Sequence, residues 1–249
     1  MKKLNITKNK FTESKYFQTK YGKLEYVSES GKVYKTNKGI ILKFNESVID
    51  EDDNYGFIVT YKDGSVKGFT EEEVNDDELC SSNNDIVKVE IKDGVTTIGN
   101  HAFNGCKSLT SVMIPSSVTS IGFFAFFECT SLTNLTIPSS VTSIGIDAFC
   151  GCTGLKTVTI PNGIKHIANG LFSHCSSLTS VSIPKSVISI GNSAFEKCSS
   201  LTSVSIPNNV REIGGAAFDF CSQLKQLIIP RNCKVHMFAF PETCEVIRK

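Results

Sequence analysis

"CKSLTSVMIPSSVTSIGFFAFFE", residues Cys106–Glu128, decides the fold because the next 23 residues repeat its pattern. The following stretch, "CTSLTNLTIPSSVTSIGIDAFCG", starts at Cys129 and keeps cysteine, leucine, isoleucine-proline and alanine-phenylalanine in the same places. The cysteine column continues at the same step through Cys152, Cys175, Cys198, Cys221 and Cys244. The alanine-phenylalanine pair recurs at Ala102-Phe103, Ala125-Phe126, Ala148-Phe149, Ala194-Phe195 and Ala217-Phe218, with Leu171-Phe172 as the bulky variant. A fixed period of this length indicates a repeat architecture.

The spacing of apolar residues inside one unit predicts two extended segments. Val112 and Ile114 lie two residues apart, which is typical of a short strand with both side chains on one face. Pro115 follows directly and ends the strand, because proline has no N–H to donate. Val118 and Ile121 then face inward from a second extended segment.

The rest of the unit predicts a corner and a short helix. Gly122 permits a sharp corner. Ala125, Phe126 and Cys129 have the spacing of one or two helical turns, with a small alanine that lets neighbouring coils approach and a phenylalanine that fills the space between sheet and helix. A single coil cannot bury these side chains, whereas stacked coils can, so the sequence predicts a solenoid with a narrow continuous core.

The string Cys-x-Ser-Leu-Thr-x-Val-x-Ile-Pro-x-x-Val-x-x-Ile-Gly-x-x-Ala-Phe resembles the BspA-like leucine-rich repeats. The resemblance covers about 85–244, and the units at both ends are irregular, as the caps of a solenoid are. The expected fold is a repeat solenoid of leucine-rich-repeat type, with short parallel strands and short helices, in about seven coils over residues 81–249. The resemblance implies adhesion or protein binding, and it implies no catalytic centre and no ligand residues.

Residues 1–80 lack the repeat and are expected to form a small β-rich N-terminal domain. "GKLEYVSESGKVYKT" and "GFIVTYKDGSVKGF" have the pattern of hairpins, and the second has Asp63-Gly64 at its turn. "GIILKF" is a further strand candidate, and "TEEEVNDDEL" predicts a short acidic helix that leads into the repeats.

Composition excludes several classes of protein. The net charge of +1 gives no overall attraction to nucleic acid, and arginine and aromatic residues do not alternate as in a nucleic-acid reader. No stretch approaches the roughly 20 apolar residues that a membrane helix needs, so membrane insertion is not expected. The N-terminal lysines precede no apolar signal-peptide segment. The sequence therefore predicts a cytoplasmic protein, with cell-surface exposure by a non-classical route as the alternative.

The cysteines and histidines do not form a pattern that predicts chemistry. Seven of the ten cysteines belong to the repeat column, where cysteine acts as a small buried apolar residue. Cys150 and Cys152 form a CxC, but no second pair at zinc-like spacing follows. No histidine recurs with a carboxylate in register, as general acid-base catalysis would require. No catalytic residue, metal site or cofactor is predicted.

Three hypotheses for function remain. The first is a non-enzymatic protein-binding or adhesive module that uses the faces of the solenoid. The second is a structural binder of ice or mineral, since a regular column of threonines begins with Thr96, Thr119 and Thr142. Lys165, Ile188 and Arg211 interrupt this column. The third is a catalytic or regulatory N-terminal domain that the repeats deliver to a target.

The variable columns of the repeat locate a candidate partner-binding patch. The positions between glycine and alanine-phenylalanine, and the two after phenylalanine, are polar in most units. They are apolar in two neighbouring units, at Phe123, Phe124, Phe127, Ile146 and Cys150. Exposed apolar patches mark interaction sites, so this patch is expected to contact a protein partner or, by self-association, a second copy of the chain. The alternative is that the N-terminal domain covers the patch or that some of these residues pack between coils.

Overall fold

The computed structural model describes residues 2–4, 18, 20, 23–27, 34–38, 40–44, 55–75, 79 and 85–249. The chain divides into two compact units. The N-terminal unit comprises Met1–Asn54 and Asp63–Gly68, and the solenoid unit comprises Tyr55–Lys62 and Phe69–Lys249. The predicted division into domains at residue 80 stays a prediction.

The N-terminal unit contains a four-stranded sheet in the order β1-β4-β3-β2. Its strands are β1 (Lys2–Leu4), β2 (Leu24–Val27), β3 (Tyr34–Thr36) and β4 (Ile41–Phe44). β2 and β3 pair antiparallel, which confirms the strands of the first predicted hairpin, and its turn at 28–33 lies outside the described residues. The turn expected at Asp63-Gly64 is also present: Gly64 has φ +80°, and the Ser65 N–H donates to Asp63 Oδ1 at 2.9 Å. β6 (Val66–Phe69) follows this turn.

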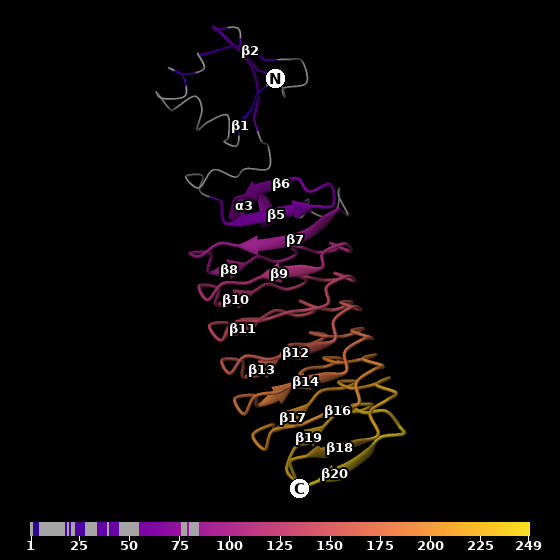
Figure 1. Cartoon of the computed structure of the whole chain (residues 1–249). Helices are drawn as coiled ribbons and strands as arrows, with labels where there is room; N and C mark the ends of the chain where they lie inside the picture. The colour runs from indigo at the N-terminus through magenta and orange to yellow at the C-terminus, as the bar shows by residue number, and fades with distance from the viewer. Residues whose placement is uncertain are drawn as a thin grey trace. The chain divides into compact units, whose positions relative to one another are not determined.

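Each coil of the solenoid unit contributes to two parallel ladders of short strands, and Figure 1 shows the coils stacked in chain order. Cα partners in the ladders of the complete coils are 23 residues apart, as for Ser120 and Ser143, so the sequence period is the coil period. The first ladder contains β7 (Ile86–Ile91), β9 (Ser111–Met113), β12 (Thr157–Thr159), β14 (Ser180–Ser182), β16 (Ser203–Val204), β18 (Gln226–Ile229) and β20 (Glu245–Arg248), with an isolated bridge at Asn134. The second contains β8 (Thr97–Ile98), β10 (Ser120–Ile121), β11 (Ser143–Ile144), β13 (His166–Ile167), β15 (Ser189–Ile190), β17 (Glu212–Ile213) and β19 (Lys234–Val235).

The core matches the predicted inward columns. Val112, Val118 and Ile121 are buried, Met113 faces solvent, and Ile114 packs partly buried against the core. The phenylalanines form a stack through the solenoid, with ring centroids 5.1–6.1 Å apart and interplanar angles of 5–21° between successive coils. The members of the stack are Phe103, Phe126, Phe149, Phe172, Phe195, Phe218 and Phe240. The solenoid and its parallel strands, in about seven turns, are confirmed.

The predicted short helices are wrong: the segment from the glycine to the cysteine of each coil is a series of turns. In the coil of Phe126, two residues with left-handed backbone, Phe124 (φ +54°) and Glu128 (φ +53°), interrupt any right-handed helix. Alternate N–H groups instead donate to the next coil, as from Phe126 to Ala148 O at 2.8 Å. We call these stacked segments the turn wall. It connects the second-ladder strand of each coil to the first-ladder strand of the next.

Gly122 is required for close approach and not for a left-handed corner. A Cβ at this position would lie 2.5 Å from Asn100 Oδ1 and 2.6 Å from Asn100 N of the preceding coil. The same conflict recurs at Gly191 and Gly214. Glycine therefore removes a steric conflict between coils at most positions of this column, and among the complete coils Ala168 is the one residue of the column that carries a side chain.

The cysteine column has a hydrogen-bonding role that its burial alone does not explain. The Cys152 thiol donates to the Phe126 carbonyl at 3.2 Å, and the same bond recurs at Cys129, Cys175, Cys198 and Cys221 at 3.1–3.3 Å. Burial raises the pKa of Cys152 to about 12. Cys106 differs from these thiols because it is disulfide-bonded.

The serines and threonines connect the coils. The Thr119 and Thr142 hydroxyls donate to carbonyls 23 residues earlier, at 3.2 and 3.4 Å. Ser140 Oγ donates to Val118 O at 2.7 Å from a partly buried position. The high serine and threonine content thus supplies bonds between coils in addition to the backbone ladders.

The N-terminal end of the solenoid is capped within its own unit. β5 (Phe57–Tyr61) pairs antiparallel with β7, so the first ladder does not begin with a free edge. The Phe57 ring lies 5.8 Å from Phe103 and tilts by 59°, which covers the end of the phenylalanine stack. α3 (Glu71–Asn75) begins at a capping box in which Thr70 N–H donates to Glu73 Oε2 at 2.8 Å.

Phe149→Ala is expected to lower the free energy of unfolding by about 3–5 kcal/mol, because it removes a fully buried ring from the middle of the stack. Phe220→Ala is the matched control, since that ring is 59% exposed. Its cost should be under about 0.5 kcal/mol. Urea denaturation measures both variants, and equal losses would contradict the assignment of inward and outward columns.

Ser140→Ala and Ser117→Ala change the same repeat position with different expected results. Ser140 loses its bond to Val118 O, which should cost about 1 kcal/mol. Within the described residues, the Ser117 hydroxyl is buried without a hydrogen-bond partner, so its removal should be neutral or stabilising. Urea denaturation of the two variants tests this, and a larger loss from Ser117→Ala would show that the inter-coil bond does not carry the effect.

Candidate functional site

The turn wall presents two residues of left-handed backbone in each complete coil, and their side chains point away from the core. The first of these columns contains His101, Phe124, Asp147, Gly170, Ser193, Ala216 and Phe238. The second contains Gly105, Glu128, Gly151, His174, Lys197 and Phe220. Left-handed backbone costs a non-glycine residue roughly 1–2 kcal/mol. Glycine would serve the fold better at most of these positions, so large side chains there are candidates for function.

The structure brings the predicted aromatic residues together on this wall. The Phe124 ring is 6.0 Å from Phe123 and 5.3 Å from Phe127, both in edge-to-face arrangements. Phe123 is 42% exposed and Ile146, in the next coil, is 48% exposed. Phe124 and Phe127 are partly buried. We call Phe123, Phe124, Phe127 and Ile146 the aromatic cluster.

His101 completes the cluster, and the sequence analysis missed it. Its ring stacks on Phe124 at 5.1 Å with an interplanar angle of 11°, and it meets the edge of Phe123 at the same distance. His101 stands 23 residues before Phe124, so an alignment of the repeats would have placed the two rings side by side.

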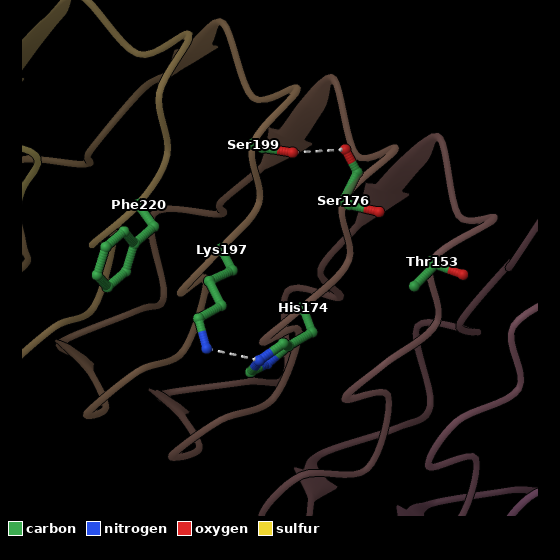
Figure 2. Close-up of a pocket in the computed structure, with 6 residues that line it drawn as sticks. All are labelled: Thr153, His174, Ser176, Lys197, Ser199 and Phe220. Atoms are coloured by element: carbon green, nitrogen blue, oxygen red, sulfur yellow. Dashed lines mark hydrogen bonds between the residues drawn. The ribbon is translucent and has the colours of Figure 1, made fainter.

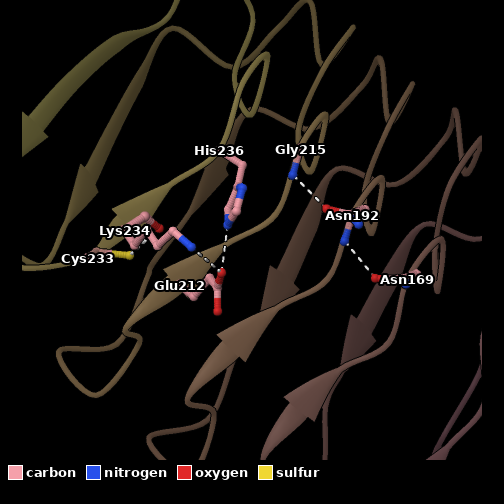
Figure 3. Close-up of polar contacts among 7 residues, drawn as sticks. All are labelled: Asn169, Asn192, Glu212, Gly215, Cys233, Lys234 and His236. Atoms are coloured by element: carbon pink, nitrogen blue, oxygen red, sulfur yellow. Dashed lines mark hydrogen bonds and ion pairs between the residues drawn. The ribbon is translucent and has the colours of Figure 1, made fainter.

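Phe123 and Ile146 interrupt a ladder of asparagines, part of which Figure 3 shows. Asn169 Oδ1 accepts the Asn192 N–H at 2.8 Å, and Asn192 Oδ1 accepts the Gly215 N–H at the same distance. Asn100 likewise accepts the Phe123 N–H at 3.0 Å. The side chains of Phe123 and Ile146 have no acceptor and cannot continue this ladder. These two coils therefore carry exposed apolar side chains where an inter-coil hydrogen bond was available.

Cys150, the fifth residue of the predicted patch, is a half-buried free thiol and contributes little exposed surface. Burial raises the pKa of Cys150 to about 11, and the Asp147 carboxylate adds to the shift. A hydrogen bond from the Ser173 hydroxyl opposes it in part. Cys150 is therefore a thiol, not a thiolate, near neutral pH.

A second feature of the turn wall was not predicted. Three consecutive coils present His174, Lys197 and Phe220 in the second left-handed column, beside Thr153, Ser176 and Ser199. Together they line a hollow of about 390 Å³, shown in Figure 2. The sequence signal was the replacement of glycine in this column by three large and chemically different side chains.

A third cluster is ionic and lies beside the asparagine ladder in Figure 3. Glu212 Oε1 is 2.6 Å from His236 Nε2 and 3.4 Å from Lys234 Nζ. The hydrogen bond from His236 and the Lys234 ammonium lower the pKa of the exposed Glu212. These residues belong to neighbouring coils, so the cluster joins the last complete coil to the irregular C-terminal coil.

The described residues contain no group of three or more His, Cys, Asp or Glu side chains that could hold a metal ion. No helix in that part of the chain has the length and apolar character to cross a membrane.

Comparison with protein families identifies the repeat. A model described as the BspA type leucine rich repeat region matches residues 76–167 and 119–247, in six copies. The chain belongs to the BspA-type leucine-rich repeat family. The match spans both strand ladders and the turn wall. Among curated proteins, none is significantly similar to this member of the family.

Solved structures of bacterial leucine-rich repeat proteins resemble the BspA-type solenoid. The Treponema pallidum leucine rich repeat protein TpLRR is 34% identical over 55% of this chain and 64% of its own, with a TM-score of 0.52. A leucine-rich repeat protein of Eubacterium ventriosum is 31% identical over 61% of this chain and 41% of its own, with a TM-score of 0.57. The chain thus spans less than two thirds of either protein. A leucine rich cell surface protein of Faecalibacterium prausnitzii is 24% identical over 90% of this chain and 76% of its own, with a TM-score of 0.51, and shares the fold.

The labelling of Cys150 by iodoacetamide should accelerate about tenfold per pH unit up to about pH 11, because only the thiolate reacts and burial raises the pKa of Cys150 to about 11. Cys152 is the control: it is fully buried and should stay unlabelled in native protein. Mass spectrometry of peptides labelled between pH 7 and pH 10 measures both rates. A Cys150 rate that levels off below pH 9 would contradict the expected environment.

Proposed function

We propose that the solenoid is a non-enzymatic protein-binding module and that the aromatic cluster of the turn wall is its contact site. The observation that carries this proposal is the exposure of Phe123 and Ile146 at positions where asparagine would add an inter-coil hydrogen bond. Aromatic side chains concentrate binding energy at protein interfaces. Their grouping with His101 gives a rigid surface, since each ring is held by a neighbour.

A structural binder of ice or mineral is less well supported. The Thr119 and Thr142 hydroxyls donate to the preceding coil, so their hydrogens are engaged inside the protein. The column then continues with lysine, isoleucine and arginine, which cannot match a repeating lattice. A catalytic N-terminal domain has no supporting observation among the described residues.

The disulfide at Cys106 favours exposure at the cell surface over the cytoplasm. Disulfides persist in oxidising environments and are rare in the cytosol. We therefore propose a surface or secreted location for the binding module.

Photo-crosslinking tests the contact site directly. Benzoylphenylalanine in place of Phe123 should form a covalent adduct with one defined protein when the producing cells, and any surface to which they attach, are irradiated. The same residue at Met113, which is 55% exposed on β9, should not form that adduct. Adducts of equal yield from both positions, or none from position 123, would contradict the proposal.

Phe123→Asn combined with Ile146→Asn should abolish binding while leaving the free energy of unfolding within about 1 kcal/mol of wild type, because each asparagine restores an inter-coil bond. Met113→Asn is the control substitution on the strand face and should bind normally. Pull-down of the partner that crosslinking identifies measures binding to each variant, and urea denaturation measures stability. If the double variant unfolds, the two side chains belong to the core.

A further inference from the structure

The hollow on the turn wall combines a cation, an aromatic ring and hydroxyl groups, and it lies outside the aromatic cluster. Its volume of about 390 Å³ falls within the range of small-ligand sites, roughly 300–1,000 Å³. Figure 2 shows the Lys197 amine directed at the His174 ring, with Phe220 in the next coil and the hydroxyls of Ser176 and Ser199 above them.

Lys197 is held in place by its neighbours. Its Nζ lies 3.0 Å from His174 Nε2 and 6.0 Å from the centre of the Phe220 ring. An ammonium only donates, so His174 Nε2 must accept, and the ring proton is then on Nδ1. His174 Nδ1 lies 2.8 Å from Ser173 Oγ and donates a hydrogen bond to it. Ser173 is buried. The buried serine thus fixes the imidazole, and the imidazole fixes the lysine.

Lys197 retains capacity for an anion. One of its three N–H groups serves His174, and Glu196 Oε1 is 3.7 Å away as an ion pair. The Lys197 side chain is exposed enough for solvent to screen this pair, and such pairs are worth about 0–1 kcal/mol. A ligand carboxylate at hydrogen-bond distance would therefore compete successfully with Glu196.

The Phe220 ring supplies a flat apolar surface. It is 59% exposed and stands on left-handed backbone with φ +58°, at the position that Gly105 and Gly151 occupy in earlier coils. The backbone at this position does not require the ring, because glycine adopts the same φ without strain. An exposed aromatic face suits the C–H face of a sugar ring.

The hydroxyls around the hollow are arranged as acceptors. Thr153 and Ser199 donate to Thr130 O and Ser176 O of preceding coils, each at 3.4 Å. A hydroxyl whose hydrogen is engaged keeps lone pairs for an incoming donor. Sugar hydroxyls are such donors, and Lys197 supplies the complementary positive charge.

We propose that this hollow binds an acidic sugar residue of a glycan. The sugar ring lies on Phe220, its carboxylate accepts hydrogen bonds from Lys197, and its hydroxyls donate to Ser199. The site is open, so a single sugar should bind weakly, with a Kd on the order of 1 mM. It is independent of the aromatic cluster, and Phe123→Asn with Ile146→Asn should leave it intact.

Saturation-transfer NMR with the full chain tests the proposal, with 3′-sialyllactose as the acidic probe and lactose as its neutral counterpart. Sialyllactose should bind about tenfold more tightly than lactose, the effect of one good charge-assisted hydrogen bond. Equal binding of the two sugars, or no saturation transfer at 10 mM ligand, about ten times the expected Kd, would overturn it. Displacement of sialyllactose by an acidic peptide that carries no sugar, at equal concentration, would also overturn it.

Two variants assign the contacts without endangering the fold. Phe220→Gly should abolish binding of both sugars and should not destabilise the protein, because glycine suits φ +58°. Lys197→Gln should reduce sialyllactose binding to the level of lactose. Glu128→Gly changes the same column outside the hollow and should bind as wild type does. Unchanged binding of sialyllactose by Phe220→Gly or by Lys197→Gln would show that the hollow is not the site.

Discussion

The contact between one phenylalanine ring and the ring of the next coil is the interaction on which the rest of the solenoid depends. Centroids 5.1–6.1 Å apart and nearly parallel planes require successive coils to keep the same shape and register. Backbone ladders set a similar spacing, about 4.8 Å between hydrogen-bonded strands. The ring contacts and the strand hydrogen bonds can form together only when the backbone of every coil follows the same path.

This constraint explains the composition of the other columns. A residue in a stacked column must tolerate its own equivalent in the coils on both sides. Glycine at 122 tolerates a backbone approach that would place a Cβ 2.5 Å from Asn100 Oδ1. Serine, threonine and asparagine also bond to their neighbours, because the hydroxyls donate to the preceding coil and the asparagine oxygens accept from the following one. A column of like charges would be repulsive, and Lys165, Ile188 and Arg211 alternate in character accordingly.

The sequence predicts the core and fails at the turn wall for a physical reason. Period-two spacing at Val112 and Ile114 has one structural solution once Met113 must face solvent. The spacing of Ala125, Phe126 and Cys129 is compatible with two structures, because a helix and a series of turns both place these residues on one side. Only the residues with left-handed backbone distinguish the turns from a helix. The sequence signal for that backbone was glycine at 105, 151 and 170, in columns where other coils carry different residues. The contacts of His101 and the hollow beside Lys197 arise between coils, so reading one unit at a time could not show them.

In the turn wall, the preference of the backbone for glycine conflicts with the side chains that are present. Its left-handed positions favour glycine, yet Phe124, His174, Lys197 and Phe220 occupy them. The phenylalanine stack lies behind the wall and stays the same whichever side chain projects outward, so a coil can change its surface without changing its core. The aromatic cluster and the hollow lie on successive coils of one wall, which would let a single glycoprotein contact both. A sugar site with millimolar affinity is weak alone, but linkage to a second contact raises the effective concentration and hence the overall affinity, by as much as about 10²–10⁴. On the proposed function, a repeated coil with variable outward positions offers several weak sites in register, and the constraint that fixes the core also fixes the spacing between them.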